Sequence, residues 1–235
     1  GRMIMDYALD WQRSQGVRAV YLDATLAGRP LYNALGFVSL GVYSWYVQTP
    51  VEKHNRAVLL ARGGNLRASV AEVDALTQLS TLDVAAYGAN RLGLLASLLA
   101  HPDTRLITVD DAAGQPAGYL VVCLTSRDGS LTYTGVRIGP WVATSDQAAA
   151  SLLLRALEQA DDWRSRIAGA PYVLVALPET NPAALDLLRA AGCQPERDDL
   201  LMRLDLAAGK KGELAPPGLA GNPALVYAWM ASMTF

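Results

Sequence analysis

Two segments of this 235-residue chain show the same order of predicted elements. In each one an apolar strand is followed by a turn, a short helix, a glycine and a second strand. The segments are 156 positions apart, and the aligned pairs are Val17 with Val173, Thr25 with Asn181, Tyr32 with Leu188, and Gly36 with Gly192. The pattern predicts an internal repeat of α/β units.

The first copy occupies residues 1–48 and reads as helix, strand, short helix and strand. Residues 17–23 form an apolar strand pattern, residues 29–35 a short helix, and residues 37–47 a strand rich in Val, Tyr and Trp. About 50 residues are too few to bury a stable core alone. The apolar residues that recur on one face of the first helix are Met3, Ile4, Tyr7, Ala8 and Trp11.

Residues 49–66 are predicted as a linker, because they contain Pro50 and the Gly63-Gly64 pair. Residues 67–206 are predicted to form a second domain, and residues 207–235 a tail that packs on the body. Thr144 with Gln147 predicts a capping box, and Asn181 before Pro182 predicts a second helix start. The predicted helices are 69–79, 83–99, 144–160 and 182–191, and the predicted strands are 106–110, 116–125, 131–142, 172–176 and 200–206.

Composition narrows the classes of function. Apolar residues make up 51% of the chain, which is enough to fill a core, and a net charge of −2 argues against a surface that neutralises nucleic-acid phosphates. No apolar run reaches the length of a membrane-spanning helix, and no signal region begins the chain. With only two histidines in the chain, we expect no metal site. We expect the two cysteines, Cys123 and Cys193, to be inert thiols in the core. We therefore expect a cytoplasmic protein, and the excess of arginine over lysine is typical of a GC-rich bacterial genome.

Several motifs together resemble the GNAT superfamily of N-acetyltransferases. Residues 1–5 (GRMIM), 21–25 (YLDAT) and 29–37 (RPLYNALGF) are similar to the C-terminal half of a GNAT domain. Residues 83–91 (DVAAYGANR) and 138–143 (IGPWVA) are similar to the second domain of tandem GNAT proteins of the YitH/HolE type. The resemblance implies an α/β (α+β) fold with a mixed, mostly antiparallel sheet flanked by helices, repeated in tandem with the first copy incomplete.

The repeat and the resemblance together predict that the first copy starts outside this chain. The second copy starts near residue 66, so the same spacing places the start of the first copy about 90 residues before residue 1. Residues 1–48 are then the C-terminal half of a first GNAT domain.

The resemblance also implies acetyl-CoA as cosubstrate, without a metal. A glycine-rich turn at a helix start holds pyrophosphate through free N–H groups, so Gly1 and Arg2 are candidate cofactor contacts. The alternative is that these two residues are merely a frayed chain end. Thr25 stands where the family contacts the pantetheine arm, although it also suits the cap of the next turn. Arg29 is a candidate phosphate contact or a solvated surface residue.

Tyr32 is the candidate catalytic residue. In the resembling enzymes a tyrosine in this short helix lies near the CoA sulfur and acts as a general acid, because a phenol can donate its proton to a departing thiolate. The alternative is an aromatic residue on a core-facing stripe with Leu31 and Leu35. Both interpretations stay open.

The second copy departs from the catalytic pattern. Residues 142–148 contain no glycine and include Asp146, whose charge would repel pyrophosphate, and Leu188 replaces the tyrosine. We therefore expect this copy to bind a substrate, a ligand or a partner instead.

Three polar residues of the second copy are spaced by four. Asp83, Tyr87 and Arg91 would share one face of a helix, which suits recognition of a polar small molecule or else an exposed salt-bridged face. Trp141 is a candidate pocket residue, with a core position as the alternative.

Two classes of function follow from these features. The first is transfer of an acetyl group from acetyl-CoA to a primary amine of a small-molecule or peptide acceptor, with the first domain catalytic and the second substrate-binding or regulatory. The second is a non-catalytic module that binds a small molecule or mediates dimerisation, for example as a homodimer. Neither involves a nucleic acid or a membrane. The residues that select the acceptor, and the general base, are expected before Gly1.

Overall fold

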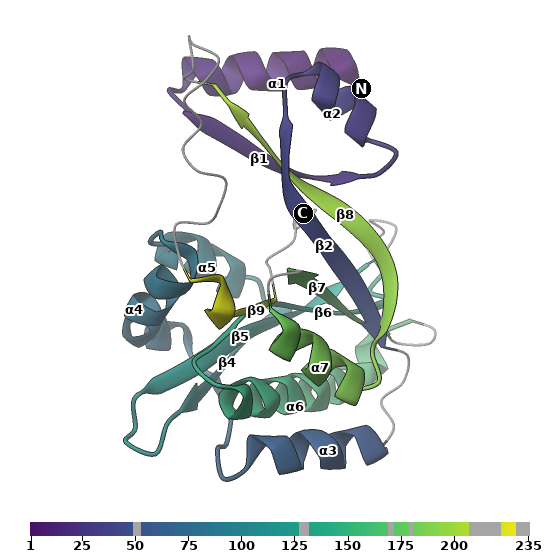
Figure 1. The fold of residues 1–235 in the computed structure, drawn as a ribbon. Coiled ribbons are helices and arrows are strands. Elements are labelled where there is room, and N and C mark those ends of the chain that lie inside the picture. Colours follow the sequence, from purple (N-terminus) through teal and green to yellow (C-terminus); the bar gives the residue numbers. More distant parts are fainter. Residues whose placement is uncertain (49–52, 127–131, 169–171, 179–180, 207–221, 229–235) are drawn as a thin grey trace. The chain divides into compact units, whose positions relative to one another are not determined.

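The computed structural model describes residues 1–48, 53–126, 132–168, 172–178, 181–206 and 222–228 (Figure 1). These residues belong to two compact units. Unit 1 takes its described residues from Gly1–Tyr43 and Asp198–Gly218, and unit 2 takes its own from Ser44–Arg197 and Leu219–Phe235.

Unit 1 confirms the four elements predicted for the first copy. They are α1 (Arg2–Ser14), β1 (Ala19–Thr25), α2 (Arg29–Ala34) and β2 (Val38–Gln48), of which β2 continues into unit 2. The last part of β8 (Gln194–Asp205) also belongs to this unit and pairs antiparallel with β1, from Ala19↔Asp205 to Thr25↔Asp199. Its small core consists of Leu9, Ala24, Phe37, Leu200 and Met202.

Helix α1 buries little of its apolar face. Leu9 is its buried residue, whereas Met3, Ile4, Tyr7 and Trp11 are between 58% and 82% exposed. The helical spacing is therefore confirmed, but the stripe that it predicted does not form a core within unit 1.

Unit 2 contains the large core. Its strands follow the order β2-β7-β6-β5-β4-β3. The strands from β3 to β6 pair antiparallel, β6 pairs parallel with β7, and β9 pairs antiparallel with β6. This mixed, mostly antiparallel sheet with flanking helices confirms the predicted fold class (Figure 1). The elements are α3 (Lys53–Gly63), β3 (Ser69–Ala71), η1 (Val73–Ala75), α4 (Leu76–Tyr87), α5 (Leu92–Leu99), β4 (Thr104–Asp110), β5 (Pro116–Thr125), β6 (Gly135–Ala143), α6 (Asp146–Asp162), η2 (Arg164–Arg166), β7 (Tyr172–Pro178), α7 (Pro182–Ala190), η3 (Pro223–Leu225) and β9 (Val226–Ala228).

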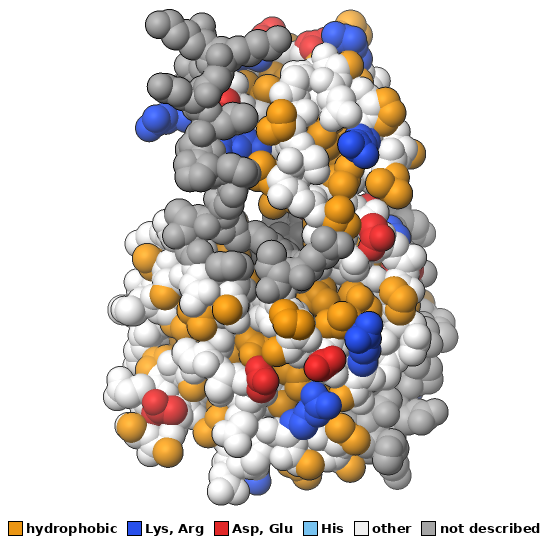
Figure 2. Space-filling model, in the orientation of Figure 1, with side chains coloured by type: hydrophobic (Ala, Val, Ile, Leu, Met, Phe, Trp, Pro, Cys, Tyr) orange, Lys and Arg blue, Asp and Glu red, His pale blue; other side chains and the backbone are white. Residues whose placement is uncertain are grey.

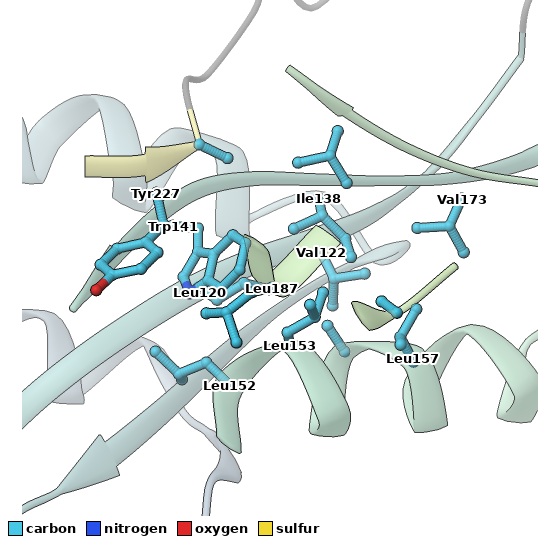
Figure 3. Close-up of a cluster of buried hydrophobic side chains, with 14 of the residues drawn as sticks. Leu120, Val122, Ile138, Trp141, Leu152, Leu153, Leu157, Val173, Leu187 and Tyr227 are labelled. Atoms are coloured by element: carbon cyan, nitrogen blue, oxygen red, sulfur yellow. The ribbon is translucent and has the colours of Figure 1, made fainter. Parts of the chain in front are cut away.

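Two clusters of apolar side chains fill unit 2, and α6 lies in the larger one. The stripe predicted for α6 is confirmed, since Leu152, Leu153 and Leu157 are fully buried against β5 and β6 (Figure 3). The smaller cluster packs α4 and α5 against residues of β4, β5 and β6, such as Tyr119. Cys123 and Cys193 are buried, and burial raises the pKa of these thiols to about 11 and about 12, as inert core residues require.

Three local predictions differ from the structure. The segment predicted as a linker contains α3, which packs on α6 through the fully buried Leu59. The predicted helix 69–79 begins instead as β3, which pairs with β4. The predicted helix 83–99 is two helices, because Gly88 ends α4 with a φ of +69° that favours glycine.

Both predicted helix starts exist, although one uses a different cap. The Asn181 side chain accepts a hydrogen bond from Ala184 N at 3.2 Å, as predicted. At α6 it is Ser145, and not Thr144, that accepts from Ala148 N at 3.2 Å. The Thr144 hydroxyl donates instead to Ala117 O.

Membrane-spanning helices and metal-binding clusters were also considered for the part of the chain that the structure describes. None of the helices in this part of the chain combines the length and the apolar character needed to cross a membrane. The same part holds no group of three or more His, Cys, Asp or Glu residues placed to bind a metal ion.

Candidate functional site

The turn between β1 and α2 brings three of the predicted residues together in unit 1. Thr25 ends β1, and its hydroxyl oxygen accepts a hydrogen bond from Gly28 N at 3.2 Å. This bond confirms the cap interpretation of Thr25 and leaves its hydroxyl hydrogen free for another acceptor. Arg29 is the first residue of α2 and is exposed.

Tyr32 lies over this turn. Its ring is so close that a Cβ atom on Gly28 would come within 3.1 Å of Tyr32 Cε2 and 3.4 Å of Thr25 Oγ1. The ring also packs edge-on against Phe37, with 5.8 Å between centroids, and is half-buried on the core of unit 1. Tyr32 therefore packs on the core of unit 1, as the core alternative predicts, and it stays partly exposed beside Thr25. Its catalytic role stays a prediction.

Gly1 and Arg2 form the start of α1. Gly1 precedes the first turn of this helix, and no side chain caps it. Arg2 is exposed, and its Nε lies 3.8 Å from Oδ2 of Asp6, one helical turn later. Such an exposed ion pair contributes little to stability, so Arg2 keeps the freedom to contact an anion.

Asp83, Tyr87 and Arg91 come together in unit 2, although Arg91 lies beyond the end of α4. Arg91 Nη2 donates to Asp83 Oδ1 at 2.5 Å and Nε donates to Oδ2 at 3.3 Å. The guanidinium also stacks on the Tyr87 ring, 3.2 Å from its centroid. The chain turns back at Gly88, and this turn replaces the predicted single helix face.

A fourth member of this cluster was not predicted. Tyr119, a fully buried residue of β5, donates its hydroxyl hydrogen to Asp83 and accepts one from Arg91 Nη2 at 3.0 Å. Tyr119 lies in an otherwise apolar strand, and it meets Asp83 because α4 packs on β5, which the sequence of the strand does not show. We call Asp83, Tyr87, Arg91 and Tyr119 the buried polar cluster.

The buried polar cluster has little contact with solvent, and its most exposed member is Arg91, whose side chain is 15% exposed. Asp83 is 1% exposed and Tyr87 5%. Burial raises the pKa of Tyr87 to about 12 and also raises that of Tyr119. For Arg91 burial lowers the pKa, but the hydrogen bonds to Asp83 and the charges of Tyr87, Tyr119 and Asp83 together raise it above its ordinary value. Within the cluster Asp83, Arg91 and Tyr119 therefore bond to one another, and Tyr87 contributes its ring face to the Arg91 guanidinium. This geometry is that of a buried ion pair, and not of the exposed salt-bridged face considered from the sequence.

Trp141 lies in the core. Its side chain is 0% exposed and packs on Tyr227, with 5.1 Å between ring centroids (Figure 3). The core alternative therefore describes its position, and a pocket role stays a prediction.

The start of α6 carries acidic rather than basic groups. Asp146 is its first residue and accepts a hydrogen bond from the Tyr227 hydroxyl at 2.6 Å. A pocket of about 390 Å³ lies beside it, and basic and acidic side chains neighbour each other over α6 and α7 (Figure 2). The pocket is lined by Arg62, Asp146, Pro182, Ala183, Asp186 and Leu187. Two carboxylates against one guanidinium do not favour a pyrophosphate.

The comparisons with known proteins place the chain in a family. Residues 79–212 match the family described as acetyltransferase (GNAT) domain, and this match spans more than half of the chain. No curated protein matches the chain.

Solved structures share the fold at low sequence identity. A candidate acetyltransferase from Pyrococcus horikoshii matches with a TM-score of 0.66 and 19% identity, over 98% of this chain and 64% of that one. A tandem GNAT protein from the clavulanic acid biosynthesis pathway matches with a TM-score of 0.58 and 15% identity, over 89% and 70%. A GCN5-related N-acetyltransferase from Anabaena variabilis matches with a TM-score of 0.51 and 17% identity, over 86% and 49%. The chain thus spans less than two thirds of the Pyrococcus protein's length.

The mixed sheet with its flanking helices defines an acyltransferase fold of the GNAT type. The chain belongs to the GNAT acetyltransferase superfamily.

Proposed function

We propose that the protein transfers an acetyl group from acetyl-CoA to a primary amine of a small-molecule or peptide acceptor, and that unit 1 carries the chemistry. Membership of the GNAT superfamily supports acyl transfer in general. The observation that carries the finer proposal is the half-buried Tyr32 over the turn that holds Thr25 and Gly28. In unit 2 the aligned position is Leu188, which is fully buried and has no proton to donate.

The proposed reaction is direct transfer. The amine nitrogen attacks the thioester carbonyl carbon, the carbon–sulfur bond breaks, and the sulfur leaves as a thiolate. Tyr32 donates its phenolic proton to that thiolate, and a base takes a proton from the attacking amine. Thr25 orients the pantetheine arm through its free hydroxyl hydrogen, while Gly1, Arg2 and Arg29 contact the phosphates.

The role proposed for unit 2 is binding or regulation. Its helix start at Asp146 lacks a glycine-rich loop, and the groups around the neighbouring pocket are mainly acidic. A cationic amine acceptor suits that pocket better than a phosphate does. The contribution of the buried polar cluster to unit 2 is to hold α4, α5 and β5 together, because its members satisfy one another.

The test is turnover of a Tyr32→Phe variant of the longest natural protein that contains this chain. Single-turnover release of CoA is measured against a panel of amines, so that product release does not mask the chemical step. Loss of a general acid lowers this rate by about 10²–10⁴-fold. Tyr7→Phe is the matched control, because Tyr7 is 76% exposed on α1. An unchanged single-turnover rate for Tyr32→Phe would remove Tyr32 from the mechanism.

The alternative is a non-catalytic small-molecule-binding or dimerisation module. The observation that favours it is the departure of unit 2 from the catalytic pattern at Asp146 and Leu188. Under this alternative acetyl-CoA or an amine binds, and no amine of the panel releases CoA.

A further inference from the structure

The sheet of unit 2 opens between two parallel strands. β6 and β7 pair from Gly135↔Tyr172 to Ile138↔Val175, whereas β6 continues to Ala143. Parallel strands that separate at their carboxyl ends leave backbone groups unpaired along both edges, and this crevice is where open α/β sheets bind ligands.

The chain's own residues 222–228 fill this gap. β9 pairs antiparallel with the part of β6 that β7 no longer reaches, at Trp141↔Ala228 and Val142↔Val226, and it also contacts β7 (Figure 1). Val226, Tyr227 and Ala228 are each at most 3% exposed. β9 (Val226–Ala228) therefore lies inside the sheet as a buried strand, and residues 222–225 lead into it.

Polar groups on three helices hold the segment in place. Asn181 Nδ2, at the start of α7, donates to the backbone oxygens of Ala224 and Val226, both at 3.1 Å. From α4, the Tyr87 hydroxyl donates to Ala228 O at 3.3 Å. Two further bonds come from Asn222 N to Ala85 O at 2.7 Å and from the Tyr227 hydroxyl to Asp146 at 2.6 Å.

These donors recognise peptide carbonyl groups. Asn181 is 4% exposed, and both ends of its side-chain amide are hydrogen-bonded: Oδ1 caps α7, and Nδ2 donates to two carbonyl oxygens of the segment. The Tyr227 hydroxyl of the segment in turn donates a hydrogen bond to the carboxylate of Asp146, the first residue of α6. A strand that satisfies an open sheet edge through its backbone is the usual mode of peptide recognition by β-augmentation.

We propose that the gap between β6 and β7 of unit 2 is a peptide-strand site whose resident ligand is residues 222–228 of this chain, and that it is therefore closed to acetyl-CoA. The proposal concerns unit 2 alone and does not depend on catalysis by unit 1. The acidic start of α6 fits it, because a peptide brings no phosphate to that position.

The test separates the segment from its site. A chain that ends at Gly221 is titrated with a labelled peptide of residues 222–228 (NPALVYA), and binding is followed by fluorescence anisotropy. We expect the peptide to bind, to raise the melting temperature of the shortened chain, and to resist competition by acetyl-CoA. A peptide with Val226→Asp is the control that fails to bind, because residue 226 is fully buried.

Asn181→Asp tests the recognition itself. The aspartate keeps the oxygen that caps α7 but has no N–H group for Ala224 O and Val226 O. Loss of two hydrogen bonds weakens peptide binding about tenfold or more, while helix content stays unchanged. Equal affinity for Asn181→Asp would overturn the proposed recognition, and so would a shortened chain that binds acetyl-CoA in this gap in place of the peptide.

Hydrogen exchange on the whole chain decides the question if the shortened chain does not fold. We expect the amides of residues 226–228 to be protected as strongly as those of β6, with no change when acetyl-CoA is added. Exchange at the rate of an unstructured chain, or faster exchange on addition of acetyl-CoA, would overturn the proposal. Neither result bears on the proposed catalytic role of Tyr32, because that role is tested separately by turnover.

Discussion

Asp83 offers the sharpest test of whether the buried polar cluster supports the fold or serves a ligand. In Asp83→Asn the side chain keeps its size and one acceptor oxygen for the Tyr119 hydroxyl. It loses the charge that pairs with Arg91, whose side chain is only 15% exposed, and it turns an N–H group toward the guanidinium. Removing one partner of a buried ion pair costs about 3–5 kcal/mol, because the remaining charge stays buried without compensation.

The assay is urea unfolding followed by the fluorescence of tryptophan in unit 2. We expect Asp83→Asn to lower the free energy of unfolding of unit 2 by about 3 kcal/mol, the lower end of that range, since Arg91 retains some access to water. Asp10→Asn is the matched control. It breaks an exposed ion pair with Arg13 in α1, and such pairs contribute about 0.2–1 kcal/mol.

A double-mutant cycle completes this prediction. Asp83→Asn combined with Arg91→Met removes both charges, so the double variant should be more stable than Asp83→Asn alone, with a coupling energy of about 2 kcal/mol. A loss below about 1 kcal/mol for Asp83→Asn would refute the reasoning, because a carboxylate kept for a ligand is not needed by the unliganded fold.

Three further predictions concern unit 2. Burial raises the pKa of Tyr87 to about 12, so the stability that its neutral phenol contributes is complete below the ordinary tyrosine pKa near 10 and is lost between about pH 10 and 12. In urea melts across that range, Tyr87→Phe should therefore lose about 2–3 kcal/mol less stability than wild type does. Hydrogen bonds from Tyr133 and from the Arg166 guanidinium lower the pKa of Asp103, so its contribution is present above the ordinary Asp pKa near 4 and is lost as the pH falls through the lowered pKa. The urea midpoints of wild type and Asp103→Asn should therefore differ at about pH 7, and the difference should shrink as the pH falls below about 4. Gly135→Ala should lower the free energy of unfolding by about 1–3 kcal/mol, because the new Cβ would lie 2.6 Å from the backbone oxygen of Tyr172 in β7. Gly93→Ala is the control, because its Cβ would have open space in α5 and should raise the free energy of unfolding by up to about 1 kcal/mol. Thermal melts distinguish the two variants.

The parts of the fold that the sequence predicted are those with local signals. Asn181 before Pro182 placed the start of α7, and the stripe of Leu152, Leu153 and Leu157 placed α6, because caps and helical periodicity depend only on near neighbours. The linker prediction overlooked α3, whose stability comes from packing Leu59 on α6. That contact joins residues far apart in the sequence, so no local pattern reports it.

The candidate sites show the same division. Asp83, Tyr87 and Arg91 do meet, but through the turn at Gly88 and not on the single helix face that their spacing predicted. Tyr119 joins them because α4 packs on β5, a long-range contact that the sequence of β5 alone does not reveal. The occupation of the β6–β7 gap by β9 was likewise not predicted, since a three-residue strand carries too little pattern of its own.

Hydrogen exchange with and without acetyl-CoA tests the central claim most directly, because it reads both units in one experiment. The account predicts that acetyl-CoA protects amides of residues 25–36, around Thr25 and Tyr32, and leaves those of residues 138–148 and 222–228 unchanged. Protection of residues 138–148 without protection of residues 25–36 would contradict it, since the cosubstrate would then occupy the gap that we assign to the peptide strand.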